Sequence, residues 1–286
     1  MNRLSLEKRI RVIHALVEGN SIRGTCRMTG VAKGTVLRLL TAVGQACSRY
    51  QDLHLRKLTS KRIECDEIWS FCYAKQKNLP RVYDGKDGYG AIWTWVALDS
   101  DTKLVPTWYV GHRDLDAAYA FLSDLEPRLL NTVQLTTDNW QPYREAMPGT
   151  FSKRVKYGVV EKQYGTVHWE TDEHERRYSP RQCIGMVKKK VTGRLRSDYI
   201  STSFVERQNL TMRMGMRRFT RLTNGFSKKV ENLEAAVALH FMYYNFCRPH
   251  QALNDNKALG ITPAMAARVA DHQWSINEVV QLLGSN

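Results

Sequence analysis

The sequence predicts a mixed α/β fold, an α+β arrangement with a mixed sheet, preceded by an all-α unit at the N-terminus. Two observations support this. Apolar residues recur at helical spacing through residues 1–47, and from residue 63 onward short β-type segments alternate with helical ones. The chain has 286 residues and is 43% hydrophobic, so it can bury a sizeable core around such a sheet.

The net charge of the chain and its distribution indicate what kind of partner the protein binds. A formal net charge of +15 favours nucleic acid or another anionic partner. Residues 1–62 carry ten more basic than acidic residues, whereas residues 63–149 carry five more acidic ones. Residues 150–196 and 207–229 each carry seven more basic ones. An acidic middle between basic flanks fits a metal site inside a phosphate-binding surface.

The composition also indicates where the protein is located and whether its cysteines are reduced. No apolar run reaches the length of a membrane span, and the first residues do not resemble a signal peptide. We therefore expect a cytoplasmic, nucleoid-associated protein that binds no membrane. The six cysteines form no CxxC pair, so neither a zinc ribbon nor a thioredoxin-type site is predicted, and reduced thiols are expected.

Residues 1–47 predict a helix-turn-helix DNA-binding domain. Ser5 can cap a first helix over 5–18, and Ser21 can cap a short second helix. A third helix is expected over 32–47, which completes the order of a helix-turn-helix. A generic three-helix packing unit is the alternative. The groove-facing residues expected on the third helix are Lys33, Thr35 and Arg38. Residues 48–62 predict a basic linker, or a short helix that crosses DNA.

Residues 63–286 predict a second domain built on a sheet. The expected elements are strands at 63–73, 91–100, 103–111 and 132–138, a helix over 114–130 and a helix that opens at 139. This is the element order of the ribonuclease-H-like fold, in which antiparallel strands lead into a right-handed parallel crossover. The first and fourth strands are then neighbours. A basic insert is expected at 150–196 and a C-terminal helical segment at 228–286.

Three carboxylates stand out along this order. Acidic residues are poor strand formers, so the presence of several of them in the strand predicted at 63–73 requires an explanation. Asp66 lies within that strand and Asp138 ends the fourth strand, which would bring them together. Glu206 stands near the start of an Arg-rich helix predicted over 201–221, without a basic partner at helical spacing. The simpler interpretations are a helix cap at Asp138 and a dipole-favoured residue at Glu206.

Carboxylates in such a set suit divalent metal ions. Mg²⁺ prefers oxygen ligands, and two ions about 4 Å apart can serve phosphodiester chemistry. We therefore expect Asp66, Asp138 and Glu206 to be both catalytic residues and ligands of two Mg²⁺ (or Mn²⁺) ions. Glu67 falls on the opposite face of the strand, and Glu64 lies about 7 Å along it, so neither is expected to be a ligand.

Basic residues near Glu206 and in the insert are the expected phosphate contacts, which position DNA without reading its sequence. They are Arg207, Asn209, Arg213 and Arg217 on the helix, and Lys188, Lys189 and Lys190 in the insert. The alternatives are a surface ion pair for Arg207 and a disordered surface loop for the insert.

These segments resemble a known family. CDEIWSF with Asp66, TTDNW with Asp138, and FVERQNLTMRMGMRRFTRLTNGFSKKVE with Glu206 are similar to the DDE transposases of bacterial insertion sequences, closest to the insertion-sequence-one group. YYNFCRPHQALN and GITPAMAA, farther on, resemble segments that follow the catalytic domain in many integrase-like transposases. The resemblance covers about 63–267. The 68 positions from Asp138 to Glu206 exceed the spacing of compact members.

The resemblance implies a function and partners. It implies DNA cutting and joining at the terminal inverted repeats of an element and in target DNA, with two divalent ions and a homo-oligomer assembled on DNA. Two other functions stay open: a catalytically inactive, transposase-derived DNA-binding regulator, and a structure-selective nuclease of the same fold. The intact set of Asp66, Asp138 and Glu206 favours the transposase over the regulator.

Overall fold

A six-stranded mixed sheet lies at the centre of the computed structural model, which describes residues 4–165, 183–220, 224–254 and 260–284. The strands are β1 (Arg62–Cys72), β2 (Gly90–Asp99), β3 (Trp108–Gly111), β4 (Val133–Asp138), β5 (Val155–Tyr164) and β6 (Cys183–Thr192). Their order across the sheet is β3-β2-β1-β4-β5-β6. The predicted mixed α/β class is thereby confirmed.

The pairing of the strands places the two aspartates beside one another. β1 pairs antiparallel with β2, and parallel with β4, so the first and fourth strands are neighbours as predicted. The β1–β4 ladder joins only residues 62–64 to residues 134–136. Asp66 and Asp138 therefore both lie beyond the end of this ladder, where the two strands are no longer paired.

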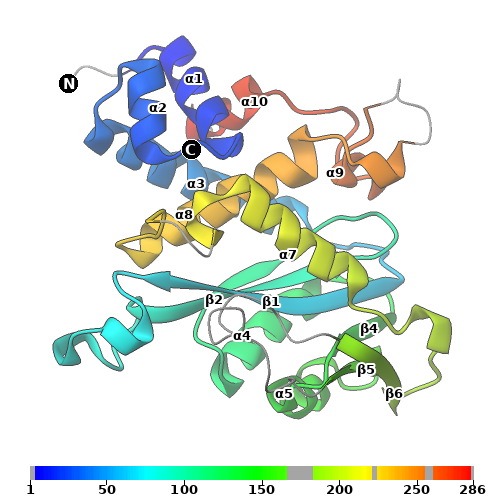
Figure 1. The fold of residues 1–286 in the computed structure, drawn as a ribbon. Coiled ribbons are helices and arrows are strands. Elements are labelled where there is room, and N and C mark those ends of the chain that lie inside the picture. The colour runs from blue at the N-terminus through cyan, green and yellow to red at the C-terminus, as the bar shows by residue number, and fades with distance from the viewer. Residues whose placement is uncertain (1–3, 166–182, 221–223, 255–259, 285–286) are drawn as a thin grey trace.

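Helices cover both faces of the sheet. Those described are α1 (Leu6–Val17), α2 (Ile22–Thr29), α3 (Lys33–His54), α4 (Leu115–Leu125), α5 (Gln141–Phe151), α7 (Ser203–Gly215), α8 (Val230–Met242), α9 (Pro263–Ala266) and α10 (Ile276–Gln281). Figure 1 shows α4 and α5 below the sheet, α7 and α8 above it, and α1, α2 and α10 beyond them. None of these described helices is both long and apolar enough to cross a membrane.

The first two helices begin and end where the sequence predicts. The hydroxyls of Ser5 and Ser21 each accept a hydrogen bond from a backbone N–H three residues on, which is an ordinary helix cap. Gly30 ends α2 in the left-handed conformation that glycine adopts without strain. The third helix was expected to end at residue 47, and it continues to His54.

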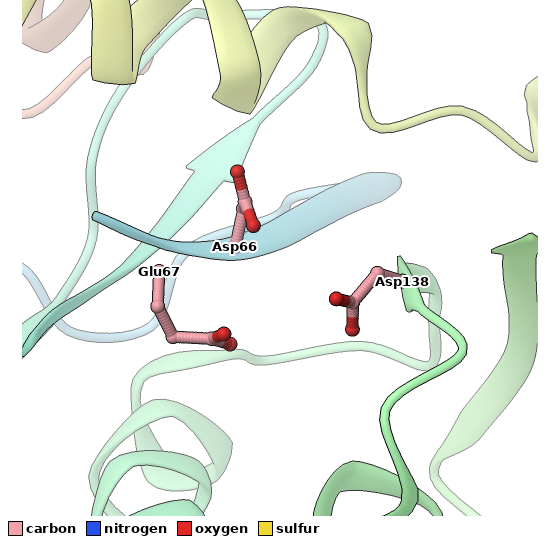
Figure 2. Close-up of side chains that lie close together, drawn as sticks. All are labelled: Asp66, Glu67 and Asp138. Carbon is pink, nitrogen blue, oxygen red and sulfur yellow. The ribbon is translucent and has the colours of Figure 1, made fainter. Parts of the chain in front are cut away.

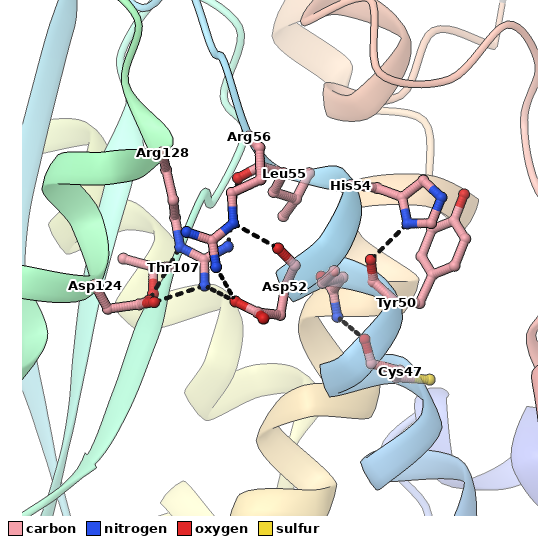
Figure 3. A network of polar contacts seen from close by, with 10 residues as sticks. Cys47, Tyr50, Asp52, His54, Leu55, Arg56, Thr107, Asp124 and Arg128 are labelled. Atoms are coloured by element: carbon pink, nitrogen blue, oxygen red, sulfur yellow. Dashed lines mark hydrogen bonds and ion pairs between the residues drawn. The ribbon is translucent and has the colours of Figure 1, made fainter. Parts of the chain in front are cut away.

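Figure 3 shows why the expected linker 48–62 is not a free segment. Nη2 of Arg128 lies 2.7 Å from Asp52 of α3 and 2.9 Å from Asp124 of α4, and Thr107 also donates to Asp124. The Arg128 side chain is only 7% exposed. The last turns of α3 are therefore fixed against the sheet-bearing part of the chain, which corrects the linker prediction.

The expected insert 150–196 supplies two strands of the sheet, so the prediction of a separate insert was wrong for these parts. β5 pairs parallel with β4, and β6 pairs antiparallel with β5 at the sheet edge. Val155, Tyr157 and Val159 of β5 are buried, and the many basic residues around them concealed this strand pattern in the sequence. Residues 166–182 lie outside the described part of the chain.

The helix predicted over 201–221 is shorter than expected. It ends at Gly215, and a separate turn of 3₁₀-helix follows at Arg217–Phe219. Val205 and Met212 of this helix are buried, as are Met216 and Phe219 just after it. Within the C-terminal segment predicted to be helical, α8 ends at Met242 and continues as a π-helical turn over Tyr243–Cys247.

Candidate metal centre

Three carboxylates meet at the open end of the β1–β4 ladder. One oxygen each from Asp66, Glu67 and Asp138 lie within 4.8 Å of one another. Figure 2 shows Asp66 and Glu67 on opposite sides of β1, with Asp138 reaching in from the end of β4. Because the two strands no longer pair there, a carboxylate at the end of β4 can be approached from both faces of β1.

Glu67 corrects the sequence interpretation, which left it out as a ligand. Its side chain does leave the opposite face of β1, as strand alternation requires, yet its carboxylate still reaches Asp138. The side chain is 1% exposed, and its Oε1 has no hydrogen-bond partner in the described part of the chain. The buried hydroxyl of Tyr143 on α5, which also lacks a hydrogen-bond partner among the described residues, interacts with this carboxylate and lowers its pKa. A buried carboxylate oxygen without a donor is unfavourable, and either this hydroxyl or a bound cation would satisfy it.

Asp66 is held in place by α7. The side-chain amide of Asn209 donates to Oδ2 of Asp66 over 2.8 Å. Asn209 is buried, so it positions a carboxylate rather than standing exposed for DNA phosphate, as the sequence had suggested. Asp138 accepts a hydrogen bond from the backbone N–H of Trp140, which fixes the turn between β4 and α5.

Glu206 joins the same cleft from the first turns of α7. A cleft of about 410 Å³ is lined by Asp66, Asp138 and Glu206 together with Arg113, Asn139, Trp140, Val160, Glu161, Lys162, Tyr164 and Thr202. Glu206 is not one of the three residues whose oxygens lie within 4.8 Å of each other. Its Oε2 is 2.7 Å from Nζ of Lys162, so its basic partner comes from β5 and not from its own helix.

Glu64 has a structural task that its position on β1 explains. Its Oε2 accepts hydrogen bonds from the backbone N–H groups of Phe204 (2.8 Å) and Val205 (3.1 Å), at the N-terminus of α7. Ser100 donates to its other oxygen. The first N–H groups of a helix lack intrahelical partners and favour a negative charge, so Glu64 anchors the helix that carries Glu206.

Arg113 is a site residue that the sequence did not reveal. Its Nε lies 3.0 Å from Oε2 of Glu67, and its Nη2 lies 3.5 Å from Oδ2 of Asp138. The guanidinium also covers the ring of Trp140, at 4.2 Å from the centroid. Arg113 stands in the loop after β3, where a single arginine carries no recognisable signal in the sequence.

Burial and mutual repulsion shift these carboxylates towards their neutral forms. Burial and, next, the charge of Asp138 raise the pKa of Asp66 to about 6. Burial and, next, the charge of Asp66 raise the pKa of Glu67 to about 7. Burial also raises the pKa of Asp138, although Arg113 and Lys162 oppose the shift. The cluster therefore favours added positive charge, as a metal site does.

The other predicted DNA contacts lie on α3, on and just after α7, and on β6. Arg207 and Arg217 are exposed on and just after α7, and Arg213 is half-buried. Lys33 and Arg38 are exposed on α3, where Arg38 donates to the half-buried Thr35. Whether they contact DNA stays a prediction.

The three lysines of the former insert lie on the edge strand β6. Lys188, Lys189 and Lys190 are all exposed. Consecutive residues of a strand point to opposite faces, so they do not form one cluster. Lys189 pairs with Glu161 of β5, whereas Lys188 and Lys190 lie on the other face, and phosphate contact by any of the three stays a prediction.

Comparison with protein-family models and with curated proteins found no match. The family resemblance therefore rests on the motifs around Asp66, Asp138 and Glu206 themselves. What this chain does has to be inferred from the chemistry of the site.

Proposed function

We propose that this chain is a DDE-type transposase with a ribonuclease-H-like catalytic unit, which cuts and joins DNA at the ends of an insertion sequence. One observation carries the proposal: Asp66, Asp138 and Glu206 line a single cleft. They come from two neighbouring parallel strands and from α7, the elements on which the sequence motifs fall. The basic surfaces around the cleft support a polyanionic substrate.

The donor set fits Mg²⁺ or Mn²⁺, because every candidate ligand is a carboxylate oxygen. Asp66, Asp138, Glu206 and Glu67 would hold the ions, with Glu206 on the α7 side of β1 and Glu67 on the α5 side. Two such ions supply activation of the attacking oxygen and stabilisation of the leaving oxygen in phosphodiester chemistry.

The chain's own cations have a second task in this proposal. Arg113 and Lys162 pair with Glu67, Asp138 and Glu206. Both cations also line the cleft, where they would bind phosphate oxygens of the DNA. Asn209 and the Glu64 anchor keep Asp66 and α7 in position throughout.

The N-terminal helices provide the proposed recognition unit. Lys33 and Arg38 are exposed at the start of α3, where the recognition helix of a helix-turn-helix contacts DNA. We expect them to bind the terminal inverted repeats of the element, and a homo-oligomer to hold the two ends together.

The deciding experiment measures cleavage and strand transfer by the full chain on DNA that carries the inverted repeats flanking its gene, with Mg²⁺ or Mn²⁺. Asp66→Asn, Asp138→Asn and Glu206→Gln should each abolish both steps and leave DNA binding intact. Near-wild-type cleavage by any one variant would remove that residue from the site. Cleavage without joining would instead identify a nuclease, and binding without cleavage a regulator.

A further inference from the structure

A second, larger cavity lies at the other end of α7. Its volume is about 720 Å³, within the range of ligand pockets. It is enclosed by the α1–α2 turn, the start of α3, residues 215–218 and 224–228, and α8. Leucines and other aliphatic side chains form its floor, among them Leu16, Leu37, Leu40 and Leu239.

The charged side chains of this cavity are all basic. Those that line it are Arg23, Lys33, Arg217, Arg218 and Lys228, and no described aspartate or glutamate is among the lining residues. An apolar floor with a wall whose described charged residues are all cationic is complementary to a ligand that combines an apolar body with a negative charge.

Among the lining residues, Arg218 shows this complementarity most clearly. Its Nε donates to the hydroxyl of Ser227 over 2.8 Å, and no ion pair joins it to a carboxylate among the residues that the structure describes. Burial of its guanidinium lowers the pKa of Arg218 to about 10, and Arg218 is one of the residues that line the cavity. A buried guanidinium without an anion is unfavourable, and its planar fork matches the oxygens of a phosphate or a carboxylate.

We propose that this cavity binds one unstacked nucleotide of a DNA strand that runs along α7. The base would rest on the aliphatic floor, and its phosphate would contact Arg218 and the lysines and arginines at the rim. This assignment rests on the proposed function, since it takes the DNA to be the substrate of the metal centre.

The geometry of α7 connects the two sites. Glu206 lines the metal cleft near the start of the helix, and Gly215 lines the cavity at its end. Nine residues of helix rise about 14 Å, which is about four nucleotides of one strand at 3.4 Å each. Figure 1 shows α7 crossing from the β4–β5 side of the sheet to the region of α3 and α8. A strand bound in the cleft can therefore reach the cavity.

The test uses the full chain and a single-stranded oligonucleotide of about 12 nucleotides that contains one 2-aminopurine, whose fluorescence rises when the base leaves its stacked neighbours. Ala236→Leu fills part of the cavity without changing its charge, and Arg218→Met removes the enclosed cation. Each should weaken binding about tenfold and suppress the fluorescence rise. Lys229→Ala, an exposed cation that does not line the cavity, should leave the rise intact.

Two results would overturn the assignment. One is an unchanged fluorescence rise in both Ala236→Leu and Arg218→Met, with thermal unfolding showing that the variants are folded. The other is that deoxyadenosine monophosphate binds as tightly as the oligonucleotide, which would make the occupant a free nucleotide. Mg²⁺-dependent cleavage by the wild-type chain is measured in parallel, so that a failure of the cavity proposal can be told from a failure of the proposed function.

Discussion

Two glutamates that flank the same aspartate have different tasks in this protein. Glu64 accepts hydrogen bonds from the start of α7, whereas Glu67 faces α5 and shares a cluster with Asp66 and Asp138. Strand alternation predicts correctly that Glu67 lies on the opposite face from Asp66. It cannot predict that Asp138 is reachable from both faces, because that depends on where the β1–β4 ladder ends.

If Glu67 contributes to a metal site, its loss should weaken metal binding. Glu67→Gln keeps the size of the side chain and removes its charge, and we expect Mn²⁺ affinity, measured by calorimetry, to fall about 10- to 100-fold. Glu161→Gln is the matched control, because Glu161 lines the same cleft but pairs with Lys189 on β6. Equal Mn²⁺ affinities in the two variants would show that Glu67 does not contribute.

The raised pKa values predict how stability depends on pH without metal. Asp66 and Glu67 have pKa values of about 6 and about 7 in the folded chain, above those of the unfolded chain. Between about pH 4.5 and 7 the folded form therefore holds more protons than the unfolded form, so the free energy of unfolding should fall as the pH rises.

Chemical denaturation at a series of pH values measures this dependence. The double variant Asp66→Asn, Glu67→Gln should remove most of the fall, and added Mg²⁺ should reduce it in the wild type by binding the ionised carboxylates. A free energy of unfolding that rises across this range in the metal-free wild type would contradict the assignment of the two groups.

At the scale of single elements, α7 is positioned by its neighbours rather than by its own sequence. No side-chain cap is present at its N-terminus, and Glu64 of β1 takes the place of one. The sequence predicts a helix over 201–221. It does not predict that α7 ends at Gly215, because the 3₁₀ turn after Gly215 depends on tertiary contacts. It missed β5 and β6 as strands because basic residues interrupt their apolar pattern.

Loss of the Glu64 anchor should therefore affect both stability and the metal site. We expect Glu64→Ala to cost about 1–2 kcal/mol of unfolding free energy, the range of a lost helix cap, and to lower cleavage although Glu64 is not a metal ligand. Glu7→Ala, in the first turn of α1 and exposed, should cost much less. Equal losses of unfolding free energy in the two variants would show that Glu64 does not anchor α7.

At the scale of the whole molecule, the N-terminal helices are packed on the sheet-bearing part of the chain. One hydrophobic cluster includes buried residues from α1 and α3 together with those of β1, β2 and α8. The sequence predicts a division into two domains from charge and periodicity, and that division stays a prediction. It could not show that α3 lies against α8, since contacts so distant in sequence leave no local pattern.

Gly44 marks the closest approach of α3 to α8. A Cβ atom at this position would lie 2.4 Å from the backbone oxygen of Ala235, so Gly44→Ala should cost about 1–3 kcal/mol of unfolding free energy. Gly34→Ala in the same helix meets only the end of Arg38 at 3.7 Å and should stabilise by about 0.5–1 kcal/mol. Denaturant titrations that rank the two variants in the opposite order would contradict the packing of α3 on α8.

The central claim is that this cluster of carboxylates binds divalent metal ions. Anomalous diffraction from crystals of the full chain grown with Mn²⁺ tests it most directly. The account predicts a Mn²⁺ peak between Asp66 and Asp138, within ligand distance of Glu67 or Glu206, with Arg113 and Lys162 displaced from their carboxylate partners. An absence of any Mn²⁺ peak at these residues, with Arg113 still paired to Glu67 and Lys162 to Glu206, would contradict it.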